Sequence, residues 1–443
     1  MITAEPPADH HVVIVGGGFG GLYVARAIAA DGIRVTLIDR RNFHLFQPLL
    51  YQVATGALAA TDIASPLRAI LERRTHVTVL LGEVMEIDPQ ARRIELADGG
   101  TIGYDSLVLA IGSITAYHGH DEWGPLAPGL KSVEEAEEIR RRVLLAFENA
   151  EREQDPARVP WWLSFVVVGG GTTGVELAGA IGEIANQAFR RRFRRIDPSR
   201  ARVVVVQSSE RLMPEFPGRL SRRAARDLAS VGVEVIYNAR VTSLDPAGAL
   251  VSSKDPGVPD ERIDAATVLW AAGVRASPLA EEVGRAVGAP VDDGGRLVVA
   301  PDLTLPGHPE IFVIGDAAAV ATNRGEILPG VAPVAMQQGH YVAGVIPARL
   351  SGRAVVPFRY RDKGTLATIG TRRAVAHIWR LNLDGLVAWL IWLFVHIVYL
   401  VEFENRVLVF IQWAWSFFTR GRSALIITGR SFAPATGPRG RRA

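Results

Sequence analysis

A glycine-rich turn near the N-terminus constrains this chain more than any other stretch. Residues 12–15 are all β-branched and predict a buried strand, and the glycines that follow have the spacing G-x-G-x-x-G. A helix is predicted after the turn, and a second strand over residues 34–38 ends on Asp39. Strand, glycine turn, helix, strand and terminal acid together make a complete dinucleotide-binding unit. We therefore predict an α/β fold organised around this unit.

Each part of the unit has a physical role. Gly16 permits the tight turn, Gly18 lets a pyrophosphate approach the backbone, and Gly21 lets the helix pack closely on the strand. The free N–H groups at the helix N-terminus face the phosphates. Asp39 stands where an acidic side chain accepts hydrogen bonds from a ribose.

The same device occurs a second time. Residues 165–182 read FVVVGGGTTGVELAGAIG, with Gly169, Gly171 and Gly174 in the spacing of the first set. Two Rossmann-like units in one chain predict two dinucleotides. In one common arrangement, a flavin is held by the first unit and a nicotinamide by the second, and hydride passes between them.

The second unit departs from the pattern at the end of its second strand. Residues 202–206 lead into Gln207, where a carboxylate normally binds the adenosine ribose. A carboxylate repels a 2′-phosphate, whereas Gln207 with Ser208, Ser209 and Arg211 does not. Either NADPH is tolerated beside NADH, or Gln207 simply hydrogen-bonds the ribose hydroxyls of NADH.

Other stretches complete the two units. Residues 104–112 and 268–273 predict buried strands that end on Gly112 and Gly273. Residues 311–316 predict a strand that delivers Asp316 to a ribityl chain, followed by a short helix over residues 317–320. Ser132 and Glu135 form a capping box for a helix that runs towards residue 151.

Two further stretches have the composition of pocket walls. Residues 41–63 are too apolar for an ordinary surface loop, and predict either a pocket lining or a core-packing connection. Residues 330–346 predict a helix with Gln337 and Gln338 among small apolar residues. Buried amides need partners, such as a flavin or quinone carbonyl, unless the glutamines sit at the exposed edge of the helix.

Composition excludes several classes of protein. The 443 residues contain no cysteine, which removes thiol nucleophiles, redox-active pairs and thiolate metal sites. The net charge of +3 is small and nearly all cations are arginine, so we expect no nucleic-acid partner. The histidines at positions 10, 11, 118 and 120 lie in polar stretches without ligand-like partners, so we expect no metal site. The polar, acidic residues 1–11 do not have the pattern of a signal peptide, so we expect the cytoplasmic side of the membrane.

The C-terminal region changes character at about residue 380. Residues 386–401 and 407–418 are two apolar, aromatic-rich segments, and Arg420 and Arg422 follow the second. Sixteen helical residues reach about 24 Å, short of a hydrocarbon core of about 30 Å. We predict a monotopic anchor at the membrane surface, with a buried core or dimer-interface helix pair as the alternative.

These motifs together resemble the type II NADH:quinone oxidoreductases over nearly the whole chain. The most specific matches are FHLFQPLLYQVATG and GGGTTGVELAGAI. The resemblance favours a pocket lining for the first of them. It implies four parts: an FAD domain over residues 1–115 and 281–360, an NAD(P)H domain over residues 116–280, and an anchoring region over residues 361–443. It also implies a homodimer on the cytoplasmic face of the membrane.

The resemblance also implies which residues bind the cofactors. FAD would contact Gly16, Gly18, Phe19, Gly20, Gly21, Asp39, Arg40, Gln47, Val84, Ala110, Gly112, Gly315, Asp316 and Ala335. The nicotinamide nucleotide would contact Gly169, Gly171, Thr172, Thr173, Gly174, Gln207, Ser208, Ala272 and Gly273.

Two residues are implied in catalysis. Glu176 matches a glutamate beside the flavin and nicotinamide, where it can move the proton that accompanies hydride and quinone chemistry; the alternative is a helix-internal acid paired with an arginine. Gln337 is the last residue of the quinone signature A-Q-x-A-x-Q, whose first glutamine is replaced here by Pro333. Proline offers no side-chain hydrogen bond, so one quinone contact is missing.

The expected activity is hydride transfer from NAD(P)H to FAD, followed by two-electron reduction of a membrane quinone. Lack of cysteine excludes sulfide:quinone oxidoreductases, disulfide reductases and thioredoxin reductases. The alternatives are a soluble NAD(P)H-dependent reductase of a small electron-carrier protein, for which the aromatic tail has no use, and a flavin-binding NAD(P)H sensor without rapid turnover.

Overall fold

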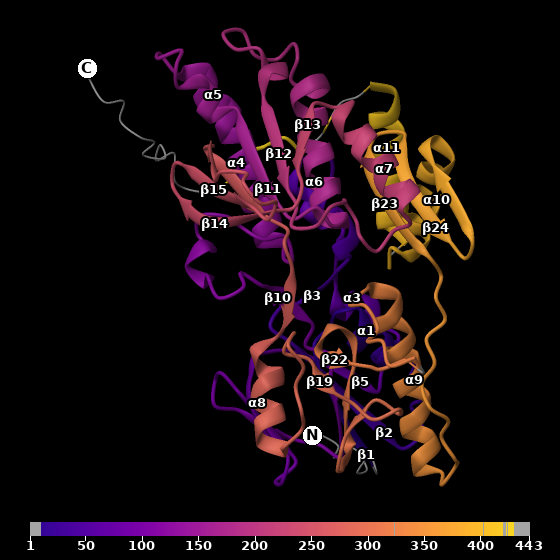
Figure 1. The fold of residues 1–443 in the computed structure, drawn as a ribbon. Helices are drawn as coiled ribbons and strands as arrows, with labels where there is room; N and C mark the ends of the chain where they lie inside the picture. The colour runs from indigo at the N-terminus through magenta and orange to yellow at the C-terminus, as the bar shows by residue number, and fades with distance from the viewer. Residues whose placement is uncertain (1–9, 323, 402, 420–421, 423, 429–443) are drawn as a thin grey trace. The chain divides into compact units, whose positions relative to one another are not determined.

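The structure is a computed structural model that describes residues 10–322, 324–401, 403–419, 422 and 424–428 (Figure 1). Arg420 therefore lies outside the described residues. The chain divides into two compact units. The first is built from residues 1–45, 64–114 and 274–362, and the second from residues 46–63, 115–273 and 363–443. β10 (Ser113–Thr115) and β18 (Val274–Ala276) stand where the chain passes between the units.

The first unit is built on a six-stranded sheet in the order β20-β21-β9-β1-β2-β5. All neighbouring strands pair in parallel except β20 and β21. Residues 12–14 of the central strand are fully buried, as expected for a parallel sheet covered on both faces. The strands are β1 (His10–Val15), β2 (Ile33–Asp39), β5 (Val77–Leu81), β9 (Ser106–Leu109), β20 (Thr304–Leu305) and β21 (His308–Val313).

Two helices of the first unit pack against each other through glycines. A Cβ on Gly339 of α9 (Ala332–Leu350) would lie only 2.5 Å from the carbonyl oxygen of Gly20 in α1 (Phe19–Ala27), so only glycine allows this approach. The remaining elements are α3 (Leu67–Leu71), α8 (Pro278–Val287), the pairs β3 (Phe43–Leu45) with β4 (Ala64–Pro66) and β19 (Leu297–Val298) with β22 (Ala318–Ala319), and the meander β6 (Val84–Asp88), β7 (Arg93–Leu96) and β8 (Thr101–Gly103).

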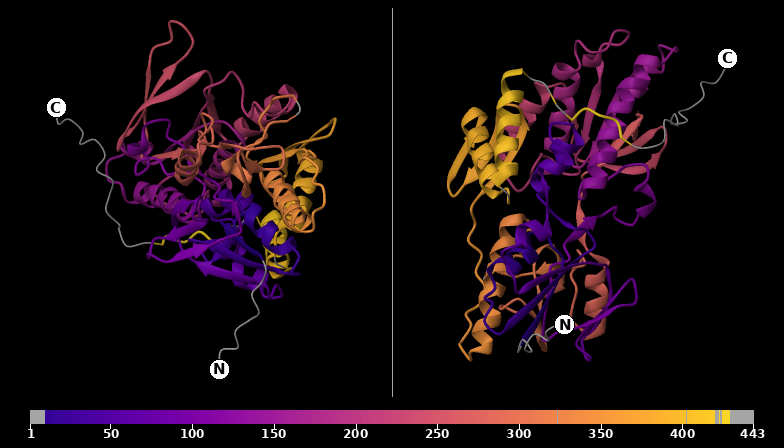
Figure 2. Two further views of the ribbon diagram at one scale, coloured as in Figure 1. Left: turned by 90° about the horizontal axis from the view of Figure 1, so that it is seen from below. Right: turned by 180° about the vertical axis from the view of Figure 1, so that it is seen from behind.

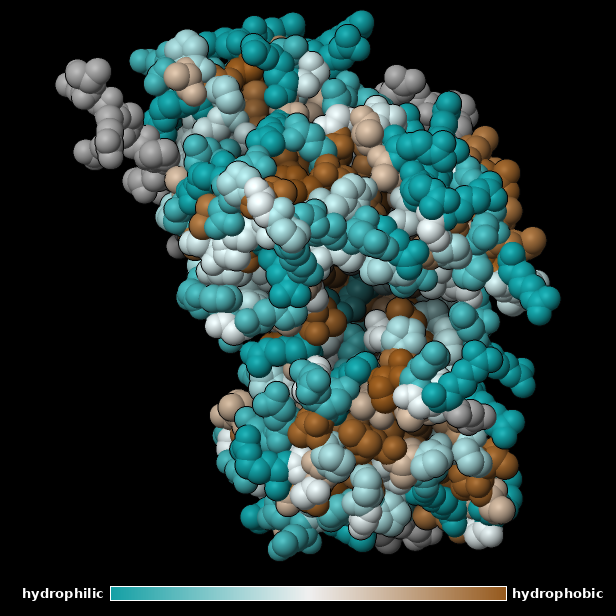
Figure 3. All heavy atoms as spheres, viewed as in Figure 1, coloured by the Kyte–Doolittle hydropathy of each residue, from teal (hydrophilic) through white to brown (hydrophobic). Residues whose placement is uncertain are grey.

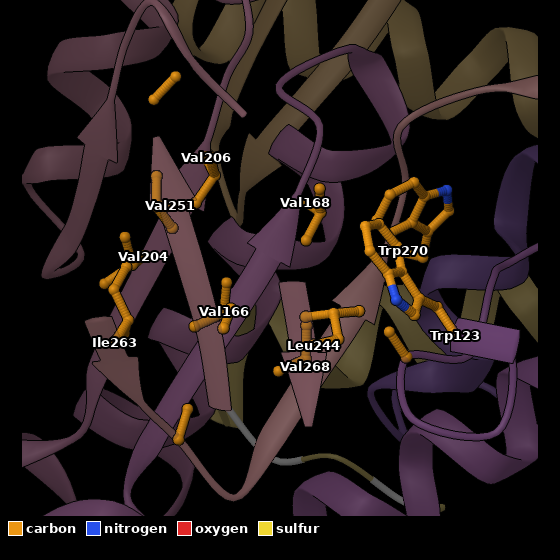
Figure 4. Close-up of a cluster of buried hydrophobic side chains, with 14 residues drawn as sticks. Trp123, Val166, Val168, Val204, Val206, Leu244, Val251, Ile263, Val268 and Trp270 are labelled. Carbon is orange, nitrogen blue, oxygen red and sulfur yellow. The ribbon is translucent and has the colours of Figure 1, made fainter. Parts of the chain in front are cut away.

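The second unit repeats the parallel arrangement with four strands in the order β13-β12-β11-β17. A three-stranded antiparallel sheet, β14-β15-β16, covers one face. Figure 4 shows valines of β11 and β12 facing Leu244, Val251 and Ile263 of that second sheet, with Trp123 and Trp270 at one end. The strands are β11 (Ser164–Val168), β12 (Arg202–Val206), β13 (Val233–Ile236), β14 (Ala239–Asp245), β15 (Gly248–Ser253), β16 (Glu261–Asp264) and β17 (Thr267–Trp270).

Helices and a small hairpin sheet complete the second unit. A Cβ on Gly179 of α6 would lie 2.2 Å from the carbonyl oxygen of Ile369, so α6 packs directly on the backbone of β23. The helices are α2 (Leu50–Ala54), α4 (Val133–Arg152), α5 (Val159–Trp162), α6 (Thr172–Glu183), α7 (Gly218–Ala229), α10 (Gly385–Tyr399) and α11 (Phe403–Thr419). The sheet contains β23 (Thr365–Gly370), β24 (Arg373–Ile378) and β25 (Leu381–Asp384), and α10 and α11 run beside it (Figures 1 and 2).

One prediction is wrong in detail. The expected helix over residues 317–320 is replaced by a short turn of 3-10 helix and the strand β22, because Ala318 and Ala319 pair in parallel with Leu297 and Val298. Local composition does not reveal this pairing between strands. The apolar segment over residues 41–63 is divided between the two units at residue 46.

The capping box of α4 is confirmed and generates a stability prediction. The backbone N–H of Glu135 donates to Ser132 Oγ at 3.2 Å, and that of Ser132 donates to Glu135 Oε2 at 2.9 Å. We expect Ser132→Ala to destabilise the second unit by about 1 kcal/mol, because one helix-terminal donor loses its acceptor. Thermal unfolding of the two proteins measures this difference. Ser132→Thr keeps the hydroxyl and should stay close to wild type; an equal loss in both variants would contradict the capping role.

Candidate active site

The first glycine turn has the geometry that a dinucleotide needs. Gly16 has a φ of +103°, and a Cβ there would lie 2.3 Å from the carbonyl oxygen of Ala110. A Cβ on Gly21 would lie 1.9 Å from the carbonyl oxygen of Gly16. Gly18 is the N-cap of α1 and has open space around its Cα. The turn therefore leaves room for phosphates at the helix N-terminus.

Asp39 closes this turn from the end of β2. Its Oδ2 accepts the Gly17 N–H at 2.6 Å, and its Oδ1 accepts the Arg41 N–H at 2.7 Å. Burial raises the pKa of the Asp39 carboxyl, and the two backbone N–H groups oppose that rise. The neighbouring side chain of Arg40 instead points to Glu83, 3.8 Å away at the surface. Val84, the first residue of β6, is half-buried.

His44 is a residue of this turn that the sequence did not reveal. Its Nδ1–H donates to the carbonyl oxygen of Gly17 at 3.0 Å, and its ring meets the edge of Phe19 with centroids 5.0 Å apart. Burial lowers the pKa of His44 to about 4, so the imidazole is neutral. Its Nε2 is buried and has no hydrogen-bond partner in the part of the chain that the structure describes. The only sequence signal was a histidine between aromatic residues, which is not specific.

A second group of predicted flavin residues lies around Asp316. The Ser113 hydroxyl donates to Asp316 Oδ2 at 2.5 Å. Gly315 has a φ of +71°, and a Cβ placed on it would lie 3.6 Å from that of Ala335. Gly112, with a φ of +67°, has open space around it. These residues belong to the first unit, as do the first glycine turn and Asp39.

The two glutamines of α9 have different surroundings. Gln338 is almost fully buried, and its Oε1 accepts the Gly315 N–H at 2.6 Å. Gln337 is half-buried, and its amide pairs with the backbone N–H and carbonyl of Arg361, both at 3.0 Å. The buried amide that the sequence predicted in this helix is thus Gln338, one residue after the signature position.

The second glycine turn has nearly the same backbone geometry as the first. Gly169 has a φ of +103°, and its Cβ would lie 2.5 Å from the carbonyl oxygen of Ala271. A Cβ on Gly174 would lie 1.9 Å from the carbonyl oxygen of Gly169. Gly171 caps α6, and Thr172 and Thr173 form its first turn. The Thr172 hydroxyl donates to Glu215 at 2.8 Å.

Gln207 and Gly273 also border this second site. Gln207 Oε1 accepts the Gly170 N–H at 2.8 Å, the contact that Asp39 makes in the first unit. Gly273 has a φ of +134° and lies against His118, whose Nε2–H donates to the carbonyl oxygen of Ala272 at 2.8 Å. Gln47 also belongs to the second unit, where its Oε1 lies 3.4 Å from Lys131 Nζ.

Inside the second unit, α6 borders a cavity of ≈ 90 Å³. Tyr51, Gln52 and Thr55 of the α2 region line it, so the segment over residues 41–63 does contribute a pocket wall. Trp389 and Trp392 of α10 and Trp413 of α11 also line it. The cavity is large enough for several water molecules.

Glu176 is the buried acid of this cavity. Its Oε1 accepts the Thr368 N–H at 3.3 Å. Burial raises the pKa of Glu176 to about 8, and the single backbone hydrogen bond opposes this only weakly. The neighbouring Tyr51 hydroxyl lies 2.9 Å from Thr368 Oγ1, and burial raises its pKa as well. The protonated carboxyl is therefore the dominant form at neutral pH.

A second acid of α6, Glu183, carries the ion pair of this cavity. The buried guanidinium of Arg422 lies 3.6 Å from Glu183 Oε2 and donates to the carbonyl oxygens of Thr55 and Ala180. The Thr371 N–H also donates to Glu183. The arginine-paired acid of α6 is thus Glu183, whereas Glu176 has no ion pair in the described part of the chain.

α10 and α11 bury one face and expose the other. Trp392 and Trp413 pack together inside the unit, with ring centroids 5.1 Å apart, and Trp413 Nε1–H donates to Gln52. On the outer faces, Phe394 is 67% and Trp415 is 69% exposed. Figure 3 shows apolar side chains at the edge of the molecule over these helices. Among the described residues, no helix combines the length and the apolar character needed to cross a bilayer.

Comparison with known proteins places this geometry in a family. The family model of the pyridine nucleotide-disulphide oxidoreductases matches residues 10–339, and that of the NDH2 C-terminal domain matches residues 363–423. The first match defines the class, a pyridine-nucleotide oxidoreductase. The chain is 42% identical over 432 residues to the type II NADH:quinone oxidoreductase Ndh of Mycobacterium tuberculosis, covering 96% of this chain and 92% of Ndh. NdhA of the same organism is 43% identical over 441 residues, covering 97% and 92%.

This chain therefore belongs to the type II NADH:quinone oxidoreductase family, which confirms the resemblance and the fold class predicted from the sequence. The fold is similar to that of NDH2 from Plasmodium falciparum in complex with NADH, with a TM-score of 0.86 and 19% identity over 94% of this chain and 100% of that one. The sulfide:quinone oxidoreductase of Aquifex aeolicus follows at a TM-score of 0.71, with 18% identity over 98% and 100% of the two chains.

The raised pKa of Glu176 generates a prediction about stability and pH. The folded protein holds a proton on Glu176 up to a pH of about 8, whereas the unfolded chain releases it near 4.5. Stability due to this group therefore falls as the pH rises between those values, by a few kcal/mol at about 1.4 kcal/mol per pKa unit. Glu176→Gln cannot ionise and escapes this loss.

We expect the thermal midpoint of Glu176→Gln, relative to wild type, to rise as the pH increases from 5 to 8 and then to level off. Groups other than Glu176 titrate alike in both proteins and cancel in the difference. An exposed acid provides the matched control, Glu282→Gln in α8. A difference between Glu176→Gln and wild type that stays constant with pH would show that Glu176 ionises normally.

Proposed function

We propose that this protein is an FAD-dependent NADH:quinone oxidoreductase that acts at a membrane surface. It takes hydride from NADH and passes two electrons to a quinone, so that NADH, H⁺ and quinone yield NAD⁺ and quinol. The observation that carries the proposal is the pair of equivalent glycine turns, each closed by a polar side chain that accepts a glycine N–H. The full-length similarity to type II NADH:quinone oxidoreductases supports the same activity and disfavours both alternatives.

The residues of the first unit fit FAD. Open space at Gly18 and the N-terminus of α1 suit the pyrophosphate, Asp39 suits the adenosine ribose, and Asp316 suits the ribityl hydroxyls. When bound, FAD supplies the two-electron redox chemistry. Other proposed flavin contacts in this unit are Phe19, Gly20, Arg40, Val84, Ala110, Gly112, Gly315 and Ala335.

The residues of the second unit fit a nicotinamide dinucleotide. Open space at Gly171 and the first turn of α6 suit its pyrophosphate, and Gln207 suits its ribose. Gly273 would allow close approach at the nicotinamide end, where a side chain would crowd His118. The remaining proposed contacts are Thr172, Thr173, Ser208 and Ala272.

Glu176 is the proposed proton donor. Reducing a quinone to a quinol requires two protons as well as two electrons, and a carboxyl that is protonated at neutral pH can give one of them. The cavity beside it contains hydroxyl and amide groups through which Glu176 can regain a proton. The buried, aromatic wall limits bulk water around the carboxyl.

Gln337 and Pro333 define the proposed quinone edge of α9. Pro333 lies in the first turn of the helix, where a missing N–H costs no hydrogen bond. The proline is thus compatible with the helix although it removes one polar contact. Gln337 can reach a quinone if its amide leaves the Arg361 backbone.

Turnover of the purified protein tests the proposed function. We expect the cofactor released on denaturation to be FAD, and NADH oxidation to depend on added short-chain quinone. Glu176→Gln should lower the maximal rate with quinone by about a hundredfold to ten-thousandfold, the range for loss of a general acid. NADH consumption that ignores quinone would contradict the proposal.

We further propose that the outer faces of α10 and α11 bind the cytoplasmic face of the membrane, and that the protein acts there as a homodimer. Phe394→Glu would place a charge among exposed apolar residues, and we expect it to lower binding to lipid vesicles by about tenfold. Val258→Glu is the matched control, since Val258 is 52% exposed and lies in the connection between β15 and β16 of the same unit. Binding to lipid vesicles is measured by co-sedimentation, and equal binding by both variants would show that this face does not bind the membrane.

The proposed homodimer is tested separately, by light scattering of the protein in detergent.

A further inference from the structure

The polar cluster after β12 consists of Gln207, Ser208, Ser209 and Arg211. Its charge affects which nicotinamide nucleotide the second unit can bind. This inference rests on the proposed function, because it concerns the same nucleotide site. The position that holds the carboxylate of Asp39 in the first unit holds the neutral amide of Gln207 in the second. Both side chains accept a glycine N–H, but only Asp39 carries a negative charge.

The amide group of Gln207 is fully engaged within the protein. Its oxygen accepts the Gly170 N–H, and its Nε2 donates to Ser209 Oγ at 2.6 Å and to the carbonyl oxygen of Arg211 at 3.0 Å. Both amide hydrogens are therefore used. Gln207 can accept a hydrogen bond from a ribose hydroxyl, but any anion at the 2′ position must find its donors elsewhere.

Lys254 supplies a positive charge beside this position. Its ammonium donates to the carbonyl oxygen of Ser208 at 2.5 Å. Lys254 follows β15, and its backbone is held as well, since its N–H donates to the carbonyl oxygen of Asn238 at 2.6 Å. The Asn238 N–H in turn donates to the carbonyl oxygen of Ser209 at 3.2 Å. The lysine is thus tied by main chain and side chain to the residues next to Gln207.

The other charged groups near the cluster have both signs. The side chain of Asp255 accepts from Asn238 Nδ2 at 3.2 Å, and Glu215 accepts from Thr172. Glu210 is exposed. On the positive side, Arg211 donates to the carbonyl oxygen of Pro214 at 2.7 Å and is half-buried beside Gln207. Among the described residues that hydrogen-bond to Gln207 or Ser208, however, the charged ones are the cations Arg211 and Lys254.

We propose that Lys254, with Ser208 and Arg211, forms a binding site for the 2′-phosphate of NADPH, so that the enzyme accepts NADPH as well as NADH. A phosphate dianion gains charge-assisted hydrogen bonds from Lys254 and Arg211. The same phosphate would be repelled by a carboxylate at position 207. Lys254 thereby determines nucleotide specificity without contacting the nicotinamide.

Competition between two adenosine nucleotides tests the site without any redox step. The holoenzyme is titrated with 2′,5′-ADP, which carries the extra phosphate, and with 5′-ADP, which lacks it. We expect 2′,5′-ADP to bind at least as tightly as 5′-ADP to the wild type, and Lys254→Met to weaken 2′,5′-ADP relative to 5′-ADP by about tenfold. Gln207→Glu should shift the same ratio in the same direction by about tenfold or more.

Arg200→Gln is the matched control, because Arg200 is an exposed cation that precedes β12 and so lies at the opposite end of that strand. It should leave the ratio of the two affinities unchanged. A wild type that binds 2′,5′-ADP much more weakly than 5′-ADP would overturn the proposal, as would a ratio that Lys254→Met does not alter. Failure of NADH itself to reduce the bound flavin would instead overturn the proposed function.

Discussion

The fold depends on a steric contact between two backbone groups in each glycine turn. The carbonyl oxygen of Gly16 would lie 1.9 Å from a Cβ on Gly21, and that of Gly169 would lie 1.9 Å from a Cβ on Gly174. No side chain can occupy these places, so the helix begins directly against the strand that precedes it. This approach brings the free N–H groups of α1 and α6 to the ends of parallel strands, a position that suits a pyrophosphate. The catalytic organisation follows from that repeated geometry.

The second unit adds buried polar groups to this frame. α6 starts at the second glycine turn, and its next turns carry Glu176 and Glu183 into the cavity beside α2, β23 and the tryptophans of α10 and α11. The two acids differ in partner. Arg422 neutralises Glu183, whereas Glu176 is opposed only by a backbone N–H and keeps its proton. One helix thus joins the second glycine turn, the two buried acids and the cavity wall of α10 and α11 within a single unit.

The sequence predicts features that depend on neighbours along the chain. The glycine turns and the capping box of Ser132 are local, and each has the predicted form. The strand before Asp316 is also present, but it ends at Val313, and Asp316 follows in a 3-10 turn. Features that depend on distant parts of the chain were not predictable. Arg422 forms an ion pair with Glu183, which is more than two hundred residues away in the chain. His44 of β3 donates a hydrogen bond to the carbonyl oxygen of Gly17 in the first glycine turn. α9 has apolar residues on several of its faces, so periodicity does not indicate which of Gln337 and Gln338 is buried.

Rapid mixing of the reduced enzyme with a quinone tests the central claim most directly. The purified protein is reduced under anaerobic conditions with a stoichiometric amount of NADH and then mixed with a short-chain quinone, while the flavin absorbance is followed. If the account is correct, the absorbance of the oxidised flavin returns many times faster than in the same mixture without quinone. A flavin that NADH reduces but that stays reduced in the presence of quinone would contradict it and would point to a different electron acceptor.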